Sequence, residues 1–443
     1  MNEPKQSAPT DPYLIGRGAA WFAFAMTFAL MLFDYMDRQV IVSLFPYMKN
    51  EWGVTDRQLG ALVSVVSITV ALAGIPVAFI ADRYSRVKSI AVMAVVWSLA
   101  SISCMFIGNY GFLLGARALV GLGEAGYGSV GAALIASLFP LRMRASMMAT
   151  FFAAASMGSV LGVLAGGVIA ARFGWRSAFG VVGLPGLVLA LAYLKVRDYK
   201  TVKFAAREAD RPATADTFLN MVRPVARSLV RSRTMVWVWA GDAAQLAVVS
   251  ALWAWLPSYL TRVQGLPAEQ ASIKAAAVVL CGAFGSMAWG YVIDRAGAVR
   301  ARNKLYVVAT ICIMACGLLC STFLLNLAPG LQFTLVALGG FLATCTAGSI
   351  AAVVIDIIHP GIRSTGSSVL SLFRNLFGLA AGPLIAGALS DALGLRLALA
   401  ITPLLGIAAA ACFLAAAANY ESDLRNVSVA EDMIKPDLAV THG

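Results

Sequence analysis

Charged residues are scarce in this sequence: only 13% of its 443 residues are Asp, Glu, Lys or Arg, whereas 60% are hydrophobic. A soluble protein averages roughly 25% charged residues. The deficit excludes a chain of ordinary soluble domains and indicates an integral membrane protein. No small-residue cleavage site follows the first apolar run, so we expect that run to remain in the protein as a helix.

Residues for catalysis and metal binding are also few. The chain has two histidines, His359 and His442, and no Ser-His-Asp or metal-ligand pattern. The absence of a G-x-x-x-x-G-K-[ST] motif excludes ATP-driven pumping by this chain. The letters GLGEAG (121–126) match G-x-G-x-x-G, but they lie in an apolar helix with no strand before it. We therefore expect no enzyme, no metal and no cofactor.

Cysteine is not used for a disulfide framework. All seven cysteines fall within apolar segments, and no loop holds a pair. Three of them recur every four residues along one helical stripe with no His, Asp or Glu nearby, which is typical of small packing residues rather than a metal site. The seven are Cys104, Cys281, Cys312, Cys316, Cys320, Cys345 and Cys412.

Long apolar runs fill most of the chain. A membrane-spanning helix needs about 20 mostly apolar residues, and twelve segments meet this condition. They are 19–47, 58–81, 88–107, 111–139, 146–170, 177–196, 235–260, 271–293, 304–325, 331–357, 366–390 and 396–418. We predict an all-α membrane protein with twelve transmembrane helices.

One long polar stretch, 197–233, divides these helices into two sets of six. The predicted organisation is an N-terminal tail (1–18), a first half (19–196), a linker (197–233), a second half (234–418) and a C-terminal tail (419–443). Basic residues gather in the connectors on the side of both tails and of the linker, which predicts that this side is cytoplasmic. The net charge of +12 then reflects anchoring in a bacterial inner membrane or its equivalent, not nucleic-acid binding.

The two halves share landmarks at matching places. AFIADRYSRVKS (78–89) follows the second helix, and GYVIDRAGAVRAR (290–302) follows the eighth. The small-residue stretches GSVLGVLAGG (158–167) and GLAAGPLIAG (378–387) lie in the fifth and eleventh helices, where they allow close helix packing. Six-helix halves with shared landmarks are typical of duplicated transporters.

With these motifs the chain resembles the major facilitator superfamily. Within it, YMDR (35–38), RALVGLGEAGY (117–127), FGWRSAFGVVGLPGLVLAL (173–191) and WLPSYLTRVQGL (255–266) resemble the spinster-like lipid transporters. Organic-anion symporters also carry Asp-Arg in the first helix and Arg with Glu in the fourth. Three positions depart from the pattern. Ala78 stands where the family has Gly, and Val163 stands where antiporters have Pro. Asp34 stands where spinster-like proteins often have Asn.

The resemblance implies gates at the inner membrane face. Acidic and basic residues there would join the helices when the inner side is closed, and the alternative is a role in topology alone through the positive-inside rule. The expected gating residues are Asp82, Arg83, Arg86, Asp294 and Arg295.

A short set of charges lies inside the first and fourth predicted helices. Each costs about 2.5–3.5 kcal/mol to insert, so such residues suggest function. Asp34 and Arg38 are four apart and share a helix face, and Arg117 and Glu124 lie two turns apart. We expect Asp37 and Glu124 to carry protons, with Asp34 sharing the proton or holding Arg38. A purely structural ion pair is the alternative.

Substrate contacts are expected in both halves. The basic side chains would hold an anionic headgroup, while a lipid-facing Arg374 and a solvated Asp242 at a helix entry are the alternatives. The residues assigned to substrate binding are Arg38, Arg117, Arg374, Asp242 and Tyr127.

The sequence thus predicts a proton-coupled secondary transporter, acting as a monomer by alternating access. Its expected substrate is an amphipathic anion resembling a lysolipid or sphingolipid, with membrane lipid around it. A proton symporter of small organic anions, such as sugar acids, is the alternative. A receptor or sensor on a transporter scaffold is disfavoured by the intramembrane charges and both gate motifs.

Overall fold

The computed structural model describes residues 13, 15–198, 232–357 and 369–439. Its regular structure in this part of the chain is helical, with no strand. Twelve helical segments are long and apolar enough to cross a membrane. The predicted fold class is therefore confirmed.

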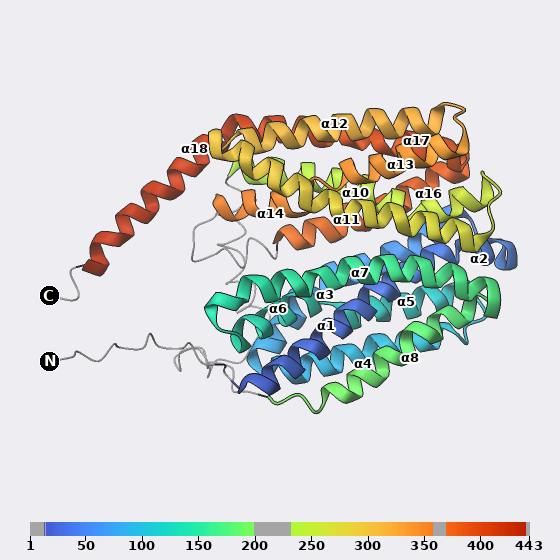
Figure 1. The fold of residues 1–443 in the computed structure, drawn as a ribbon, viewed down its shortest axis with the longest axis horizontal. Coiled ribbons are helices and arrows are strands. Elements are labelled where there is room, and N and C mark those ends of the chain that lie inside the picture. The colour runs from blue at the N-terminus through green and yellow to red at the C-terminus, as the bar shows by residue number, and fades with distance from the viewer. Residues whose placement is uncertain (1–12, 14, 199–231, 358–368, 440–443) are drawn as a thin grey trace, which may run out of the picture.

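The helices form two bundles that lie side by side (Figure 1). The N-terminal half comprises α1 (Arg17–Val40), η1 (Ile41–Ser43), α2 (Phe45–Trp52), α3 (Asp56–Arg83), α4 (Arg86–Cys104), α5 (Tyr110–Glu124), α6 (Tyr127–Leu138), α7 (Leu141–Phe173) and α8 (Trp175–Tyr193). The C-terminal half comprises α10 (Arg233–Arg262), α11 (Ala268–Val299), α12 (Asn303–Leu324), α13 (Pro329–Ala343), α14 (Thr346–Asp356), η3 (Arg374–Leu379), α16 (Ala381–Leu393), α17 (Leu395–Ile401), η4 (Thr402–Leu404) and α18 (Leu405–Ala439). Most of the predicted linker, 199–231, lies outside the described residues.

Several predicted spans are interrupted. The fourth breaks between α5 and α6, where Gly126 adopts the left-handed conformation (φ 80°) that a residue without a Cβ reaches at no steric cost. The tenth breaks between α13 and α14 at Thr344 and Cys345. The eleventh contains the π-helical η3. At the C-terminus, α18 continues as helix to Ala439, beyond the predicted end at 418.

Small residues set the packing distance between helices, as the sequence predicts. A Cβ added at Gly162 or Gly166 of α7 would lie within about 2.5 Å of a carbonyl oxygen of α1. In the other half, a Cβ at Gly378 would lie 2.9 Å from the Leu246 side chain of α10. The glycines therefore allow close packing of α1 on α7 and of η3 on α10, and α1 and α10 carry buried carboxylates.

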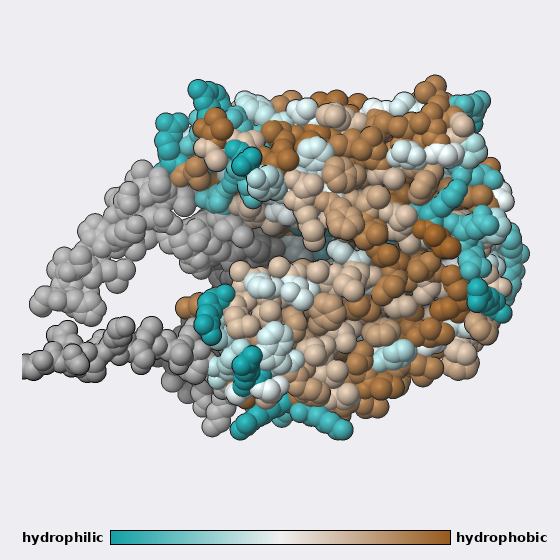
Figure 2. All heavy atoms as spheres, in the orientation of Figure 1, coloured by the Kyte–Doolittle hydropathy of each residue, from teal (hydrophilic) through white to brown (hydrophobic). Residues whose placement is uncertain are grey.

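The two halves touch at the end of the molecule that carries α2, which we call the α2 end. There α3 packs on α16, and α7 packs on α11. Figure 2 shows a hollow between the halves that opens toward the opposite end, where α1 begins. The halves thus meet at one end and diverge at the other.

Candidate functional site

Three charged side chains form a cluster in the N-terminal half. The Arg38 Nε of α1 lies 2.8 Å from Glu124 Oε2, at the end of α5, and 3.7 Å from Asp34 Oδ2, one turn back in α1. The side chains of the two acids are 0% and 3% exposed, and that of Arg38 is 16% exposed. One partly accessible arginine is thus shared by two buried carboxylates.

The local sequence brings Glu124 to this position. A Cβ at Gly121 would lie 2.6 Å from the Val66 carbonyl oxygen of α3, and one at Gly123 would lie 2.5 Å from the Trp97 backbone nitrogen of α4. These glycines allow α5 to pack directly on both helices. The break after Glu124 then ends α5 with this carboxylate beside Arg38.

Asp37 and Arg117 form a separate pair. The Arg117 Nη1 donates to Asp37 Oδ2 at 3.0 Å, and Ser101 of α4 donates to the other carboxylate oxygen. The side chains of Asp37 and Arg117 are 0% and 1% exposed. The charges of the first and fourth spans therefore form two groups, a closed pair of Asp37 with Arg117 and the partly accessible cluster around Arg38.

The Arg38 cluster is short of positive charge and of hydrogen-bond donors. With both acids ionised, Asp34 and Glu124 outweigh Arg38 by one negative charge. Asp34 Oδ1 and Glu124 Oε1 also lack a hydrogen-bond donor among the described residues. Burial without a partner disfavours a charged carboxylate, so one proton on this cluster removes the excess charge and leaves only one of the two carboxyl groups ionised.

The C-terminal half contains one ion pair of the same kind. Arg374, the first residue of η3, lies with its Nε 3.1 Å from Asp242 Oδ2 of α10. Its Nη2 donates to the Ala347 carbonyl oxygen of α14 at 3.2 Å, just past the break after α13. Asp242 is fully buried, whereas the Arg374 side chain is 22% exposed.

Tyr35 connects the two charged groups. The guanidinium of Arg38 lies 5.1 Å from the centroid of its ring, a distance at which a cation is attracted to an aromatic face. The same phenol also interacts electrostatically with Arg374, which belongs to the other half. Tyr35 of the N-terminal half thus lies near a partly exposed arginine of each half.

Tyr127 lies apart from this space. Its side chain is 2% exposed, and its hydroxyl donates to the Thr27 carbonyl oxygen at 2.8 Å. In this conformation that hydrogen bond occupies the only proton of the hydroxyl. The structure thus places Tyr127 in the packing between α6 and α1, beside the site rather than within it.

The expected gating residues lie at the open end. The Arg83, Asp294 and Arg295 side chains are exposed, and Arg295 stacks on Tyr291 at 5.0 Å. Arg86 donates to the Ser137 Oγ of α6 at 3.0 Å, within its own half. The side chain of Asp82 lies outside the described part of the structure. These observed contacts do not join the halves.

The α2 end holds a cross-half ion-pair cluster that sequence reasoning missed. The Asp56 carboxylate, 1% exposed, accepts from Arg262 Nη1 of α10 at 2.9 and 3.1 Å and from Ser390 Oγ of α16 at 2.5 Å. Lys49 adds a third donor at 2.5 Å. Charged residues near helix ends are common, so the sequence carried no signal that Asp56 is buried between the halves.

Asp391 strengthens the same junction from the C-terminal half. Its two carboxylate oxygens accept from the backbone N–H groups of Asp56 and Arg57 at 2.8 Å each. These N–H groups belong to the first turn of α3, where they have no partner within the helix and favour a negative charge. We call Asp56, Arg262, Ser390 and Asp391 the α2-end latch.

Opening of the α2 end should depend on this latch. Because a hydrogen bond to a charged group contributes about 1.5–3 kcal/mol, Asp56→Asn is expected to shift the protein toward a state open at this end. Spin labels at Phe112 and Leu331, on a background without native cysteines, would report the distance between halves. We expect a longer-distance population to increase more than tenfold, since each 1.4 kcal/mol corresponds to a factor of about ten.

The matched control is Glu269→Gln. Glu269 pairs with Arg172 across the same junction at 3.2 Å, but the two side chains are 41% and 61% exposed. Exposed pairs contribute about 0–1 kcal/mol, so this variant should leave the distance distribution nearly unchanged. An equal response of the two variants would contradict the role given to the latch.

A further ion pair at the α2 end lies within the N-terminal half. Glu51 accepts from Arg176 Nη2 and from Trp175 Nε1, each at 2.7 Å. These hydrogen bonds to Arg176 and Trp175 hold the pKa of the Glu51 carboxyl below its usual range. The contact fixes α2 on α8 and stays within one half, so it does not oppose separation of the halves.

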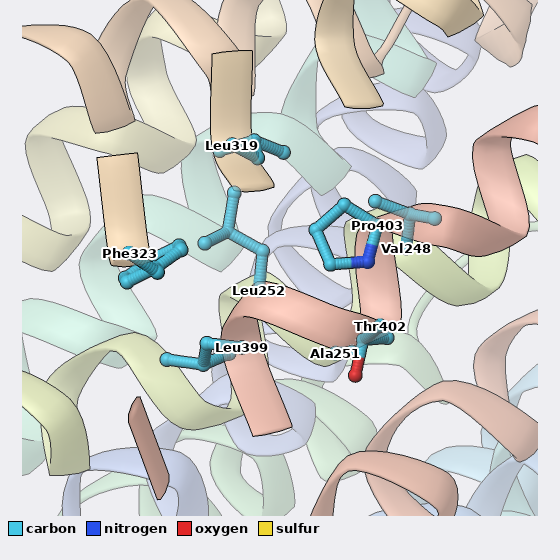
Figure 3. Close-up of a pocket in the computed structure, with 8 residues that line it drawn as sticks. All are labelled: Val248, Ala251, Leu252, Leu319, Phe323, Leu399, Thr402 and Pro403. Carbon is cyan, nitrogen blue, oxygen red and sulfur yellow. The ribbon is translucent and has the colours of Figure 1, made fainter. Parts of the chain in front are cut away.

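The pocket in Figure 3 is not part of the charged site. It lies inside the C-terminal half, between α10, α12 and the α17–η4 segment, and its lining is apolar apart from Thr402. It offers no charge to an anion or a proton. We interpret it as a packing gap.

Comparison with known proteins agrees with this architecture. A family model described as Major Facilitator Superfamily matches residues 27–382. Protein spinster of Drosophila melanogaster is 27% identical over 400 residues, which cover 88% of this chain and 65% of that protein. A gallate transporter of Pseudomonas putida is 28% identical over 457 residues, covering 96% of this chain and 98% of that one.

Solved structures show a similar fold. The crystal structure of a bacterial homologue of the human lysosomal transporter Spinster, described as inward-facing and unoccupied, aligns with a TM-score of 0.82 at 21% identity. The alignment covers 92% of this chain and 99% of that chain. The D-xylose–proton symporter is more distant, with a TM-score of 0.67 at 15% identity.

Proposed function

Because the chain belongs to the Major Facilitator Superfamily and its relatives are transporters rather than enzymes, we propose that it is a proton-coupled secondary transporter of an organic anion. The transported anion and the proton would bind between the halves, and alternating access would carry them across the membrane. In this proposal the protein acts as a monomer in a bacterial inner membrane or its equivalent, without nucleic acid, metal or cofactor.

The observation that carries this proposal is the sharing of Arg38 by Asp34 and Glu124 at 3.7 and 2.8 Å. An ionised cluster with one excess negative charge repels an incoming anion. Protonation of one carboxylate removes that charge and frees Arg38 to accept the anion. Binding of a proton and binding of the anion thereby favour each other, which is thermodynamic coupling between two ligands.

This geometry favours Glu124 and Asp34 as the proton site. Asp37, the other proton carrier expected from the sequence, has its own partner in Arg117 at 3.0 Å and a further donor in Ser101. We propose that Asp37 and Arg117 mainly hold α1 against α5. The substrate anion would bind Arg38 of the N-terminal half and Arg374 of the C-terminal half.

Two substrate classes fit an anion site of this kind. The resemblance of the sequence to spinster-like lipid transporters favours an amphipathic anion, such as a lysolipid or sphingolipid phosphate. The gallate transporter, which matches nearly its whole length, favours a small organic acid. We place the amphipathic anion first, because several spinster proteins match most of this chain, and keep the small acid as the second candidate.

The closed α2 end would face outward, since α1 begins and α18 ends at the other end, together with the basic connectors of the described residues (Figure 1). The conformation would then be open to the cytoplasm. On this assignment Asp82, Arg83, Arg86, Asp294 and Arg295 would close the inner end after the latch opens. The exposure of Arg83, Asp294 and Arg295 at the open end agrees with a gate that is not engaged in this conformation.

Uptake into proteoliposomes with an imposed pH gradient tests the proposal. The panel compares lysophosphatidylglycerol and sphingosine phosphate with gallate and gluconate, under matched gradients of pH and of potential. We expect one class to accumulate when the pH gradient is present and not without it. Transport of either class at a rate independent of the pH gradient would contradict proton coupling, and accumulation of gallate alone would select the second class.

A further inference from the structure

Arg374 is held from its buried side. Its Nε faces the fully buried Asp242 carboxylate at 3.1 Å, and one Nη donates to the Ala347 carbonyl oxygen at 3.2 Å. The Arg374 side chain itself is 22% exposed. These two contacts leave other N–H groups of the guanidinium for a ligand and orient it before any substrate arrives.

The surrounding backbone supports a functional role. Arg374 begins the π-helical segment η3, and π-helical turns within α-helices occur frequently at functional sites. Its two partners belong to α10 and to α14, which starts after the break in the tenth span. The side chain of Arg374, which belongs to η3, is therefore held by both α10 and α14. A binding group needs such support to keep a fixed direction.

The charge balance of this pair differs from that of Arg38. Asp242 is the carboxylate within ion-pair distance of Arg374 in the described part of the chain, so the pair is neutral. The other groups near it are the Thr346 hydroxyl and the Cys312 thiol, facing Asp242, and the Tyr35 phenol, facing Arg374. Such groups are ordinarily uncharged near neutral pH. An anion approaching Arg374 thus meets no excess negative charge.

We propose that Arg374 is a proton-independent anchor for the substrate anion and that Asp242 is the residue that positions it. This inference rests on the proposed function and gives the two halves different roles. Arg38 of the N-terminal half binds the anion after a carboxylate of its cluster is protonated, whereas Arg374 of the C-terminal half binds it at any pH. A planar guanidinium fork fits a substrate with a carboxylate, phosphate or sulfonate that accepts two hydrogen bonds.

Binding titrations on the full chain in nanodiscs test the anchor at about pH 5.5 and 7.5. The probes are gallate and lysophosphatidylglycerol, with methyl gallate as the ester that lacks the anion. Since a hydrogen bond to a charged group is worth about 1.5–3 kcal/mol, Arg374→Gln should weaken binding of the bound acid about 10- to 100-fold. The loss should be the same at both pH values, and Arg374→Lys, which keeps the charge without the fork, should fall between.

Asp242→Asn distinguishes two roles for Asp242: it either orients the Arg374 guanidinium or neutralises that guanidinium and so weakens its attraction for the anion. If Asp242 orients the fork, this variant should weaken binding of the acid and reduce its preference over methyl gallate, and Asp242→Glu should restore part of both. The matched control Arg57→Gln removes an exposed arginine at the α2 end and should bind like the wild type. Size-exclusion profiles confirm that each variant is folded.

Several outcomes would overturn the anchor. Wild-type affinity in Arg374→Gln, a loss confined to one pH, tighter binding in Asp242→Asn, or no binding of either acid to the wild type would each do so. Failure of the proposed function is distinguishable, because it appears as uptake that ignores the pH gradient. In that case a pH-independent loss in Arg374→Gln would still support the anchor.

Discussion

Glu124→Gln is expected to abolish accumulation driven by a pH gradient. A gradient of one pH unit supplies about 1.4 kcal/mol per proton, which sustains about tenfold accumulation of a monoanion carried with one proton. Glutamine keeps the size of the side chain and a hydrogen-bond acceptor for Arg38, which lies 2.8 Å from Glu124. It cannot exchange a proton, so the variant should only equilibrate its substrate.

Counterflow distinguishes this result from simple inactivation. Exchange of external for internal substrate needs no net proton movement, so Glu124→Gln should retain exchange while it loses accumulation. Glu269→Gln, the same substitution at an exposed position of α11, should accumulate substrate like the wild type. Full accumulation by Glu124→Gln would show that the coupling proton is held elsewhere.

Asp37→Asn is expected to destabilise the protein rather than uncouple it. The substitution leaves Arg117 buried, 1% exposed, with its ionised partner removed. Breaking a buried ion pair in this way typically costs about 3–5 kcal/mol. We therefore expect a clearly lower unfolding temperature and lower yield, while the folded fraction still accumulates substrate in response to a pH gradient.

The double variant Asp37→Asn with Arg117→Gln provides the control. Removing both charges eliminates the uncompensated guanidinium, so part of the lost thermal stability should return, as a thermodynamic cycle would measure. The opposite pattern, normal stability with no response to pH, would make Asp37 the proton carrier, as the sequence first suggested.

The fold was largely predictable from the sequence. Apolar runs of sufficient length can only be helices in a membrane, because each backbone polar group must find a partner within the segment. Intramembrane charges stand out for the same reason, and the spacing of Asp34 and Arg38 predicted their contact within α1. These inferences depend on order along the chain, which the sequence gives directly.

Partnerships between helices were less predictable. The sequence could not tell that Glu124 would meet Arg38 and that Arg117 would meet Asp37, because these pairings depend on how α5 is rotated against α1. The break after Glu124 was missed because GLGEAG lies in a long apolar run, where one glycine in the left-handed conformation leaves no distinct pattern. Asp56 and Asp391 were missed since interfacial charges look alike in a sequence, whether exposed or buried.

The central claim is that binding of the anion draws a proton to the cluster of Asp34, Arg38 and Glu124. Proton uptake measured with an indicator dye, as lysophosphatidylglycerol or gallate is added to weakly buffered protein, tests it most directly. The account predicts proton uptake by the wild type at near-neutral pH and none by Glu124→Gln, although the variant still binds. Binding by the wild type without proton uptake, or equal uptake by both proteins, would contradict it.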